Sequence, residues 1–170
     1  QAYVREGDSV LDICSYAGAW GVTAAMAGAS EVHCVDTSKS ALEQAESNAE
    51  LNGVGKNIGT EQADAFDALR QLASDNRQFD MVILDPPAFI KRRKDYRQGL
   101  AAYQRVNQLA MLLLDREGWL VSCSCSYHLS TADLLAALQR AARHVSRTLR
   151  VVEIGGQSAD HPIHPSIPET

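Results

Sequence analysis

Short apolar runs alternate along this chain with longer segments whose apolar residues recur at helical spacing. Short runs rich in β-branched residues indicate buried strands, and the longer amphipathic segments indicate helices. The predicted order is strand 9–14, helix 19–29, strand 31–36, helix 40–53, strand 57–64, helix 65–74, strand 79–85, helix 99–115, strand 117–125, helix 131–145 and strand 147–154. This alternation predicts an α/β fold, with a doubly wound, mostly parallel sheet and helices on both faces.

Local signals mark some of the element ends. Ser40 and Glu43 have the spacing of a capping box, and Asn52-Gly53 is a typical helix stop. The last stretch, 155–170, is rich in proline, glycine and polar residues and predicts a loop. A doubly wound sheet usually has one more strand there, so six strands are expected in this sequence and the last is expected outside it. Gln1 in place of an initiator Met also indicates a fragment.

The composition is typical of one globular domain, with 170 residues, 45% of them hydrophobic and 22% charged. Apolar runs such as "LAMLLLD" are too short to cross a bilayer, and no signal-peptide pattern opens the chain. A cytoplasmic location is therefore expected. The net charge of −5 argues against a general nucleic-acid binder but leaves a local basic patch open.

Polar side chains follow the predicted strands where ligands bind in such sheets. The segment "LDICSYAGAWG" (11–21) is a strand, a turn of small residues and a helix start, and its backbone N–H groups can face a polar cofactor. Asp36, after the second strand, can accept both ribose hydroxyls, and Asp64 can accept an adenine amine. An ordinary turn and two helix caps are the alternatives. Together the motifs favour an adenosine cofactor, either NAD or S-adenosylmethionine, and the missing G-x-G-x-x-G weakens NAD.

The segment "DPPAF" (85–89) is the sharpest signal. Two prolines remove two N–H donors directly after a strand, which leaves carbonyl oxygens and the Asp85 carboxylate available to a polar ligand. Phe89 offers a flat face on which a base can stack, although a strand terminator with a core Phe is the alternative. The run "KRRKDYR" (91–97) follows and suits a phosphate contact, or else an ordinary solvated face.

Two of the four cysteines stand in "SCSCS" (122–126). The four lack the C-x-x-C spacing of a zinc site and the features of a secreted disulfide scaffold, so a reduced protein without a bound metal is expected. The two-residue period of a strand puts Cys123 and Cys125 on one side, with Cys125 nearer the ligand-binding end. A small buried core residue and a nucleophile are the two interpretations of such a cysteine.

These motifs together resemble the class I S-adenosylmethionine-dependent methyltransferases. They are most similar to the catalytic domain of bacterial large-subunit (23S) ribosomal RNA cytosine-carbon-5 methyltransferases, the large-subunit methyltransferase I family. The similarity is carried by "SYAG", "VDTSKSALEQAESNAELNG", "FDMVILDPPAF", "SCS" and the late "ADHP". The resemblance implies a Rossmann-like, seven-stranded sheet with an antiparallel last strand. It implies that 1–170 is the catalytic domain alone, without the upstream RNA-binding domains.

The resemblance also implies a cofactor, S-adenosylmethionine, and a partner, large-subunit ribosomal RNA; it leaves a homodimer open. The predicted site residues are Ser15, Tyr16, Ala17, Gly18, Asp36, Thr37, Asp64, Ala65 and Asp85 for the cofactor, Pro86, Pro87, Phe89, Lys91 and Arg92 for the RNA, and Cys125 with Asp85 for catalysis. This chain departs from the family pattern at Cys14, where relatives often have Phe, and at Ala17, where many have Thr. It also lacks the second cysteine that many cytosine-carbon-5 enzymes carry after the strand-end proline.

The implied chemistry fits these residues, because a thiolate that adds to carbon-6 of cytosine makes carbon-5 nucleophilic enough to accept a methyl group. Two other functions remain open. An exocyclic-amine methyltransferase would hold its amine on Asp85 and the Pro86 carbonyl and would need no cysteine. A nucleotide-binding module or NAD oxidoreductase would leave "DPPAF" and "SCS" without a role.

Overall fold

The alternation of strands and helices predicted from the sequence is present in the computed structural model, which describes residues 3–156. The elements are β1 (Ser9–Ile13), α1 (Ala19–Met26), β2 (Glu31–Asp36), α2 (Lys39–Leu51), the 3-10 turn η1 (Gly55–Asn57), β3 (Ile58–Gln62), α3 (Ala65–Ser74), β4 (Phe79–Leu84), the 3-10 turn η2 (Arg93–Asp95), α4 (Tyr96–Leu113), β5 (Leu114–Ser122) and α5 (Thr131–His144).

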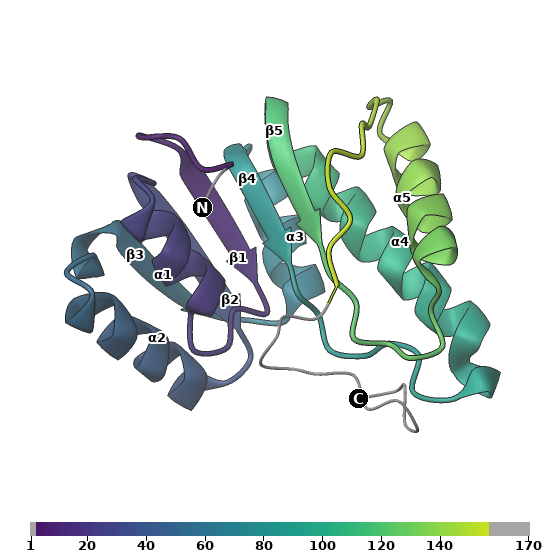
Figure 1. Cartoon of the computed structure of the whole chain (residues 1–170), viewed down its shortest axis with the longest axis horizontal. Helices are drawn as coiled ribbons and strands as arrows, with labels where there is room; N and C mark the ends of the chain where they lie inside the picture. Colours follow the sequence, from purple (N-terminus) through teal and green to yellow (C-terminus); the bar gives the residue numbers. More distant parts are fainter. Residues whose placement is uncertain (1–2, 157–170) are drawn as a thin grey trace.

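The strands form one sheet in the order β3-β2-β1-β4-β5, and every pair in it is parallel (Figure 1). β1 occupies the centre, where Val10 pairs with Val32 of β2 on one side and with Met81 of β4 on the other. Because all strands run the same way, their carboxyl ends meet at a single edge, the lower edge in Figure 1. The α/β doubly wound prediction is confirmed.

Successive residues of each strand face opposite sides of the sheet, and both sides are covered. Leu11 and Ile13 of β1 lie in a buried cluster with residues of α3, α4 and α5. Val10 faces the other side and packs in a second cluster with Ala24 of α1 and Leu42 of α2. Asp12 lies on the side of Val10 and is therefore aimed at α1, although it is fully buried.

The predicted sixth strand, 147–154, is wrong. Within residues 3–156 this segment joins no strand, and its apolar residues Val151, Val152 and Ile154 are 59–62% exposed. The guanidinium of Arg147, rather than the backbone, bonds to the carbonyl oxygens of Leu114 and Asp115 at the start of β5. A β-branched sequence favours extended backbone, but a strand also needs a ladder partner, which no described element offers here.

Two neighbouring boundaries also differ from the prediction. α4 begins at Tyr96 and β5 at Leu114, each three residues earlier than predicted. The pairing of β5 with β4 is irregular between Phe79 and Met81, and the exposed charged residues 115–117 are taken up in that irregularity. β5 ends at Ser122, which pairs with Leu84, the last residue of β4, so Cys123 and Cys125 follow the strand instead of lying within it.

The predicted capping box is wrong as well. Ser38, in extended conformation, is the N-cap of α2, and its Oγ accepts from the Ala41 N–H at 3.3 Å. Ser40 is already inside the helix, and Glu43 pairs with Lys39 at 3.7 Å. Most of the loop predicted over 155–170 lies outside the described residues, which end at 156. The "ADHP" motif lies outside them entirely.

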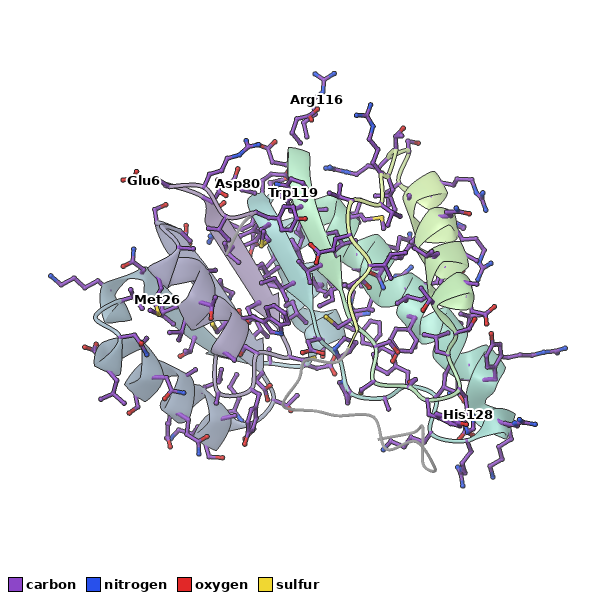
Figure 2. All side chains as sticks on the ribbon, in the orientation of Figure 1. Glu6, Met26, Asp80, Arg116, Trp119 and His128 are labelled. Carbon is purple, nitrogen blue, oxygen red and sulfur yellow. The ribbon has the colours of Figure 1, made fainter. Side chains whose placement is uncertain are left out.

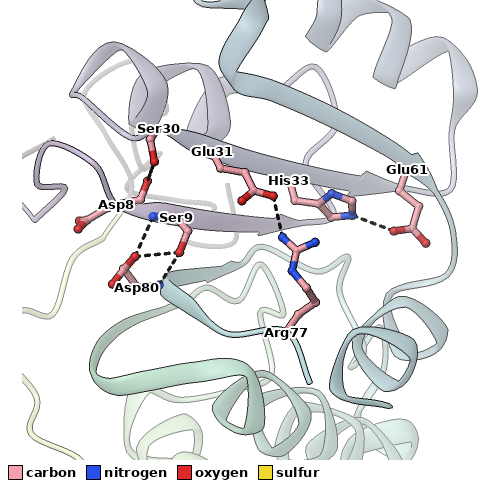
Figure 3. Close-up of polar contacts among 8 residues, drawn as sticks. All are labelled: Asp8, Ser9, Ser30, Glu31, His33, Glu61, Arg77 and Asp80. Carbon is pink, nitrogen blue, oxygen red and sulfur yellow. Dashed lines mark hydrogen bonds and ion pairs between the residues drawn. The ribbon is translucent and has the colours of Figure 1, made fainter. Parts of the chain in front are cut away.

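Polar contacts hold the amino ends of the strands together, at the edge opposite the predicted site (Figure 3). Asp80 at the start of β4 accepts from both the N–H and the Oγ of Ser9, each at 2.8 Å, and so ties β4 to β1. Arg77 pairs with Glu31 of β2 at 2.7 Å. The two bonds from Ser9 lower the pKa of Asp80, with its backbone N–H contributing most.

Asp80→Asn should therefore lower the free energy of unfolding by about 1 kcal/mol at neutral pH, since a neutral amide oxygen accepts these bonds more weakly than a carboxylate. Because the folded-state pKa is depressed, the contribution of Asp80 is present above about pH 4 and is lost as the pH falls further. Urea unfolding between acidic and neutral pH measures both effects. Asp75→Asn, at the exposed residue that follows α3, is the matched control, and an equal loss in the two variants would contradict this account.

Candidate functional site

A tight turn at the end of β1 begins the site at the carboxyl edge of the sheet. The N–H groups of Cys14 and Ser15 both donate to the Val35 carbonyl, at 2.9 and 3.1 Å, which holds the turn against β2. Tyr16 has a positive φ of 48° and Gly18 one of 77°. A Cβ on Gly18 would also come within 2.8 Å of Ala45 on α2, so only glycine fits at that position.

Asp36 fastens this turn from the end of β2. Its Oδ2 accepts from the Tyr16 N–H at 2.9 Å, and its Oδ1 accepts from the Ser38 N–H at 2.9 Å. Asn48 of α2 donates to the Ala17 carbonyl at 2.9 Å and supports the turn from the other side. The predicted cofactor residues 15–18 and Asp36 are therefore brought together by direct hydrogen bonds.

The end of β3 lies next along the same edge. Gln62 donates to the Thr37 carbonyl at 3.0 Å, which joins this strand end to the loop that contains Asp36. Asp64 is the N-cap of α3, where its Oδ1 accepts from the N–H groups of Phe66 and Asp67. The cap is real, yet it uses one carboxylate oxygen, and the exposed Asp64 retains the other for a ligand.

Asp12 was missed by the sequence reasoning. It is fully buried, its Oδ2 accepts from the Gly21 N–H at 2.9 Å, and its Oδ1 has no partner among the described residues. Burial is the main reason why the pKa of Asp12 is raised to about 7; the carboxylates of Asp85 and Asp36 act in the same direction, and the Gly21 bond opposes them. The only signal in the sequence was one acidic residue inside the apolar run "VLDIC".

Trp20 was missed too, because it reads as an ordinary residue of the first helix. Its indole Nε1 donates to Oδ2 of Asp85 at 3.1 Å, across the gap between α1 and the end of β4. Trp20 is 45% exposed. The bond orients the Asp85 carboxylate at the mouth of the turn and connects the predicted cofactor region with "DPPAF".

The four thiols have different environments. Cys34 is buried, Cys14 and Cys123 are half-buried, and Cys125 is exposed. Burial raises the pKa of each of the first three to about 12, with further contributions from nearby carboxylates, so these thiols stay neutral at physiological pH. The Cys123 N–H still bonds to the Leu84 carbonyl at 2.8 Å, whereas Cys125 lies free of the sheet with its Sγ 3.7 Å from the Pro86 carbonyl oxygen.

A buried set of hydroxyl groups holds the Cys125 loop in place. The Ser126 Oγ accepts from the Ile90 N–H at 3.1 Å and lies 2.9 Å from the Tyr103 hydroxyl. The Ser124 Oγ donates to the same Tyr103 hydroxyl at 2.9 Å. Both neighbours of Cys125 are thus fastened to α4, and one of them to the loop that follows "DPPAF". The role of Tyr103 was not visible in the sequence, where it reads as a core residue of a helix.

The remaining predicted substrate residues are spread over the adjoining surface. Phe89 packs between Tyr103 and Phe66, with ring centroids 4.8 and 6.2 Å away. Phe89 and Lys91 line a cavity of about 280 Å³ beside α4. Arg92 pairs with Asp95 at 3.0 Å, so its guanidinium already has an anionic partner.

A family model described as Conserved hypothetical protein 95 matches residues 1–133. The chain belongs to the Conserved hypothetical protein 95 family. MJ1649 of Methanocaldococcus jannaschii, provisionally named a ribosomal RNA large subunit methyltransferase, is 40% identical over 96% of this chain and 42% of its own length. Ribosomal RNA large subunit methyltransferase I of Erwinia tasmaniensis is 36% identical over 96% of this chain and 42% of its own length. The chain thus spans about two fifths of these relatives.

Among solved structures, SMU.776, described as a methyltransferase complexed with SAH, superposes with a TM-score of 0.82. The superposition covers 96% of this chain and 43% of that one, at 20% sequence identity. This member of the Conserved hypothetical protein 95 family therefore has the Rossmann-like fold of class I S-adenosylmethionine-dependent methyltransferases and is related to the large-subunit ribosomal RNA methyltransferase I proteins.

Residues 3–156 of this family member contain neither a membrane-spanning helix nor a metal-binding cluster. None of the helices there combines the length and the apolar character that a bilayer crossing requires. No group of three or more His, Cys, Asp or Glu side chains in that range is arranged to hold a metal ion. What the edge does offer is two orphaned buried oxygens, Asp12 Oδ1 and Ser15 Oγ, beside a glycine-dependent turn, and these fit a polar cofactor.

Tyr103→Phe should loosen the Cys125 loop while it preserves the ring packing against Phe89. The buried hydroxyl of Ser126 and the exposed Ser124 lose a common partner, so the free energy of unfolding should fall by about 1–3 kcal/mol. The rate at which Cys125 is alkylated, measured by peptide mass spectrometry, should also differ from the wild-type rate.

Tyr3→Phe removes one exposed hydroxyl, which bonds to Glu153, and is the matched control. Tyr3→Phe should lower the free energy of unfolding by much less than Tyr103→Phe does, since water replaces the lost bond at an exposed position. If Tyr103→Phe behaves like Tyr3→Phe in both stability and Cys125 alkylation, the hydroxyl network does not position the cysteine.

Proposed function

We propose that this chain is the catalytic domain of an enzyme that methylates large-subunit ribosomal RNA with S-adenosylmethionine, at carbon-5 of a cytosine and through a covalent adduct with Cys125. The observation that carries the proposal is an exposed thiol, Cys125, beside the carbonyl of Pro86, the residue after Asp85. Its loop is held by the buried Ser126 and Tyr103 hydroxyls at the carboxyl edge of the sheet. The names of the relatives support large-subunit ribosomal RNA as the substrate.

The turn 15–18 and the two strand-end carboxylates would hold the cofactor. Asp36 is at the right place for ribose hydroxyls, and Asp64 has an oxygen available for an adenine amine. Asp12, with its orphaned oxygen and its pKa of about 7, would interact with the amino-acid portion. When bound, S-adenosylmethionine supplies an electrophilic methyl group on a positively charged sulfur.

Cys125 would act on the other side of Asp85. Its thiolate adds to carbon-6 of the cytosine, and the electrons of the 5,6 double bond make carbon-5 a nucleophile. After carbon-5 has been methylated, a base such as a water molecule takes the carbon-5 hydrogen as a proton, its bonding electrons re-form the 5,6 double bond, and the thiolate departs from carbon-6. Asp85, oriented by Trp20, can hydrogen-bond the ring during the adduct's lifetime. The cytosine has to be unstacked to reach such a site.

The alternative, methylation of an exocyclic amine, would use Asp85 and the Pro86 carbonyl as acceptors for that amine. In this structure the Pro86 carbonyl oxygen accepts from the Cys125 thiol. The supposed amine acceptor is therefore next to a nucleophile that amine chemistry does not require, and this favours the cytosine reaction.

The cofactor proposal predicts that Asp36→Ala weakens S-adenosylmethionine binding by about 1.5–3 kcal/mol, the range for hydrogen bonds to a charged group. Isothermal titration calorimetry with S-adenosylmethionine, and in parallel with NAD, measures it. Asp67→Ala, on the exposed surface of α3, removes the same charge away from the turn and should leave binding unchanged. Tight binding of NAD without binding of S-adenosylmethionine would contradict the proposal.

The nucleophile proposal predicts that Cys125→Ala abolishes methyl transfer to ribosomal RNA while cofactor binding persists. Cys123→Ala, the matched control, should retain transfer and lose stability instead, because its thiol is half-buried and neutral. RNA with fluorine at carbon-5 of the target cytosine should trap the wild-type enzyme covalently, since fluorine cannot leave as a proton. Full transfer by Cys125→Ala would redirect the proposal to the exocyclic amine.

A further inference from the structure

A second, larger cleft lies at the carboxyl edge, beyond the residues assigned to the cofactor. It measures about 670 Å³, within the range of ligand sites, and we call it the basic cleft. It is lined by Arg93, Lys94, Tyr96, Arg97, Tyr127 and His128. Figure 2 shows His128 at the end of the molecule opposite Arg116 and Trp119, which mark the amino-end side of β5.

The basic cleft is built from two loops that are pinned together beside Cys125. The Ile90 N–H donates to the Ser126 Oγ at 3.1 Å, and from this point the chain segments separate. One leads to Arg93 and the start of α4, and the other forms a turn closed by the Leu129 N–H on the Ser126 carbonyl at 2.9 Å. Tyr127 is two residues from Cys125, so their Cα atoms are at most about 7 Å apart. The basic cleft therefore adjoins the proposed nucleophile.

The charge of the basic cleft is available to a ligand. Within the described part of the chain, Arg93, Lys94 and Arg97 form no ion pair, in contrast to Arg92, which binds Asp95. The carboxylate of Asp133, which faces Tyr96, accepts from the Ser130 hydroxyl at 2.5 Å and forms no ion pair with any of these three cations. A protein of net charge −5 thus presents three cations with no ion-pair partner at the edge where the sheet binds its ligands.

Aromatic rings accompany these cations. Tyr127 is 58% exposed, and its ring meets that of His128 edge-on, with centroids 5.0 Å apart. Cations that track a phosphate backbone, together with exposed rings on which bases stack, are the features that bind single-stranded nucleic acid. An acidic protein segment would use the charges and would leave the exposed Tyr127 ring without a role.

We propose that the basic cleft binds the unpaired nucleotide adjacent to the target cytosine, with its phosphate on Arg93, Lys94 and Arg97 and its base stacked against Tyr127. The inference rests on the proposed function, because it assumes that RNA reaches Cys125. It implies that the RNA strand approaches Cys125 along α4 and over the turn 127–128. It also transfers the phosphate contact from Lys91 and Arg92, predicted from the sequence, to the next cations along the chain.

The test compares two double variants that remove the same charge. Arg93→Gln/Arg97→Gln lies in the basic cleft, whereas Arg105→Gln/Arg116→Gln is exposed elsewhere. The probe is a short fluorescent single-stranded RNA of mixed sequence, titrated at several salt concentrations. The slope of log K against log salt is negative, and in the cleft variant its magnitude should fall by about 0.7 for each cation removed. The control variant should keep the wild-type slope, and equal slopes in the two variants would overturn the phosphate contact.

Tyr127 tests the stacking. Tyr127→Ala should weaken binding of the single-stranded RNA about tenfold, whereas Tyr127→Phe should keep most of it, because the ring provides the stacking surface. A duplex of the same sequence should bind more weakly and should not respond to either change. Equal responses of Ala and Phe, or a poly-glutamate peptide that binds as tightly as the RNA, would identify a general anion site and overturn the proposal.

Steady-state methyl transfer separates this inference from the proposed function. If the wild type methylates ribosomal RNA and the cleft variants raise KM for RNA with cofactor affinity unchanged, both stand. If the wild type methylates and the cleft variants match it in KM, only the basic cleft is overturned. If no RNA accepts a methyl group from S-adenosylmethionine, the proposed function fails, and this inference fails with it.

Discussion

The buried hydroxyl of Ser126 joins the two loops on which the proposed chemistry depends. It accepts from the Ile90 N–H, meets the Tyr103 hydroxyl, and so fixes the loop after β4 against the loop after β5. Cys125 and the Pro86 carbonyl lie in these two loops, and both walls of the basic cleft continue from them. Because a buried hydroxyl without partners is costly, the bonds keep the two loops in one arrangement. Buried polar groups thus fix the position of the loop that carries the exposed Cys125 thiol.

Burial and the nearby strand-end carboxylates keep two of the thiols at the carboxyl edge protonated. Burial is the main cause that raises the pKa of Cys14 and Cys123 and keeps both thiols neutral; Asp12 and Asp85 contribute to both, and Asp36 to Cys14. Cations gather instead beyond Ile90, where the chain is basic and exposed. The edge therefore has a negative part, suited to hydroxyl and amine groups and to a positively charged sulfur, and a positive part, suited to phosphates.

Sequence patterns predicted the order of the elements and the edge at which the site lies, because strand and helix periods are local properties and parallel strands share an end. The pattern failed for 147–154, whose β-branched residues find no partner strand among the described elements. Boundaries around β5 shifted because the irregular pairing near Asp115 depends on β4. Spacing alone could not show which charges in "KRRKDYR" are neutralised, since that depends on the Arg92–Asp95 contact.

Trp20 and Tyr103 were invisible for a related reason. Each reads as an ordinary helical residue, and its role exists only in the three-dimensional contact it makes, with Asp85 or with the serines beside Cys125. Asp12 could have been recognised as the one acidic residue in an apolar strand, because a buried polar group needs a hydrogen-bond partner or a ligand.

The central position of β1 has a consequence for how the protein is made. Residues 9–65 contain every residue assigned to the cofactor except Asp85, and 79–126 contain the proposed nucleophile and most of the basic cleft. β1 is the strand through which the two halves of the sheet join. Chains are synthesised from the amino terminus, and parallel strands pair only after long crossovers. During translation most of the cofactor half is therefore synthesised before the proposed nucleophile, Cys125.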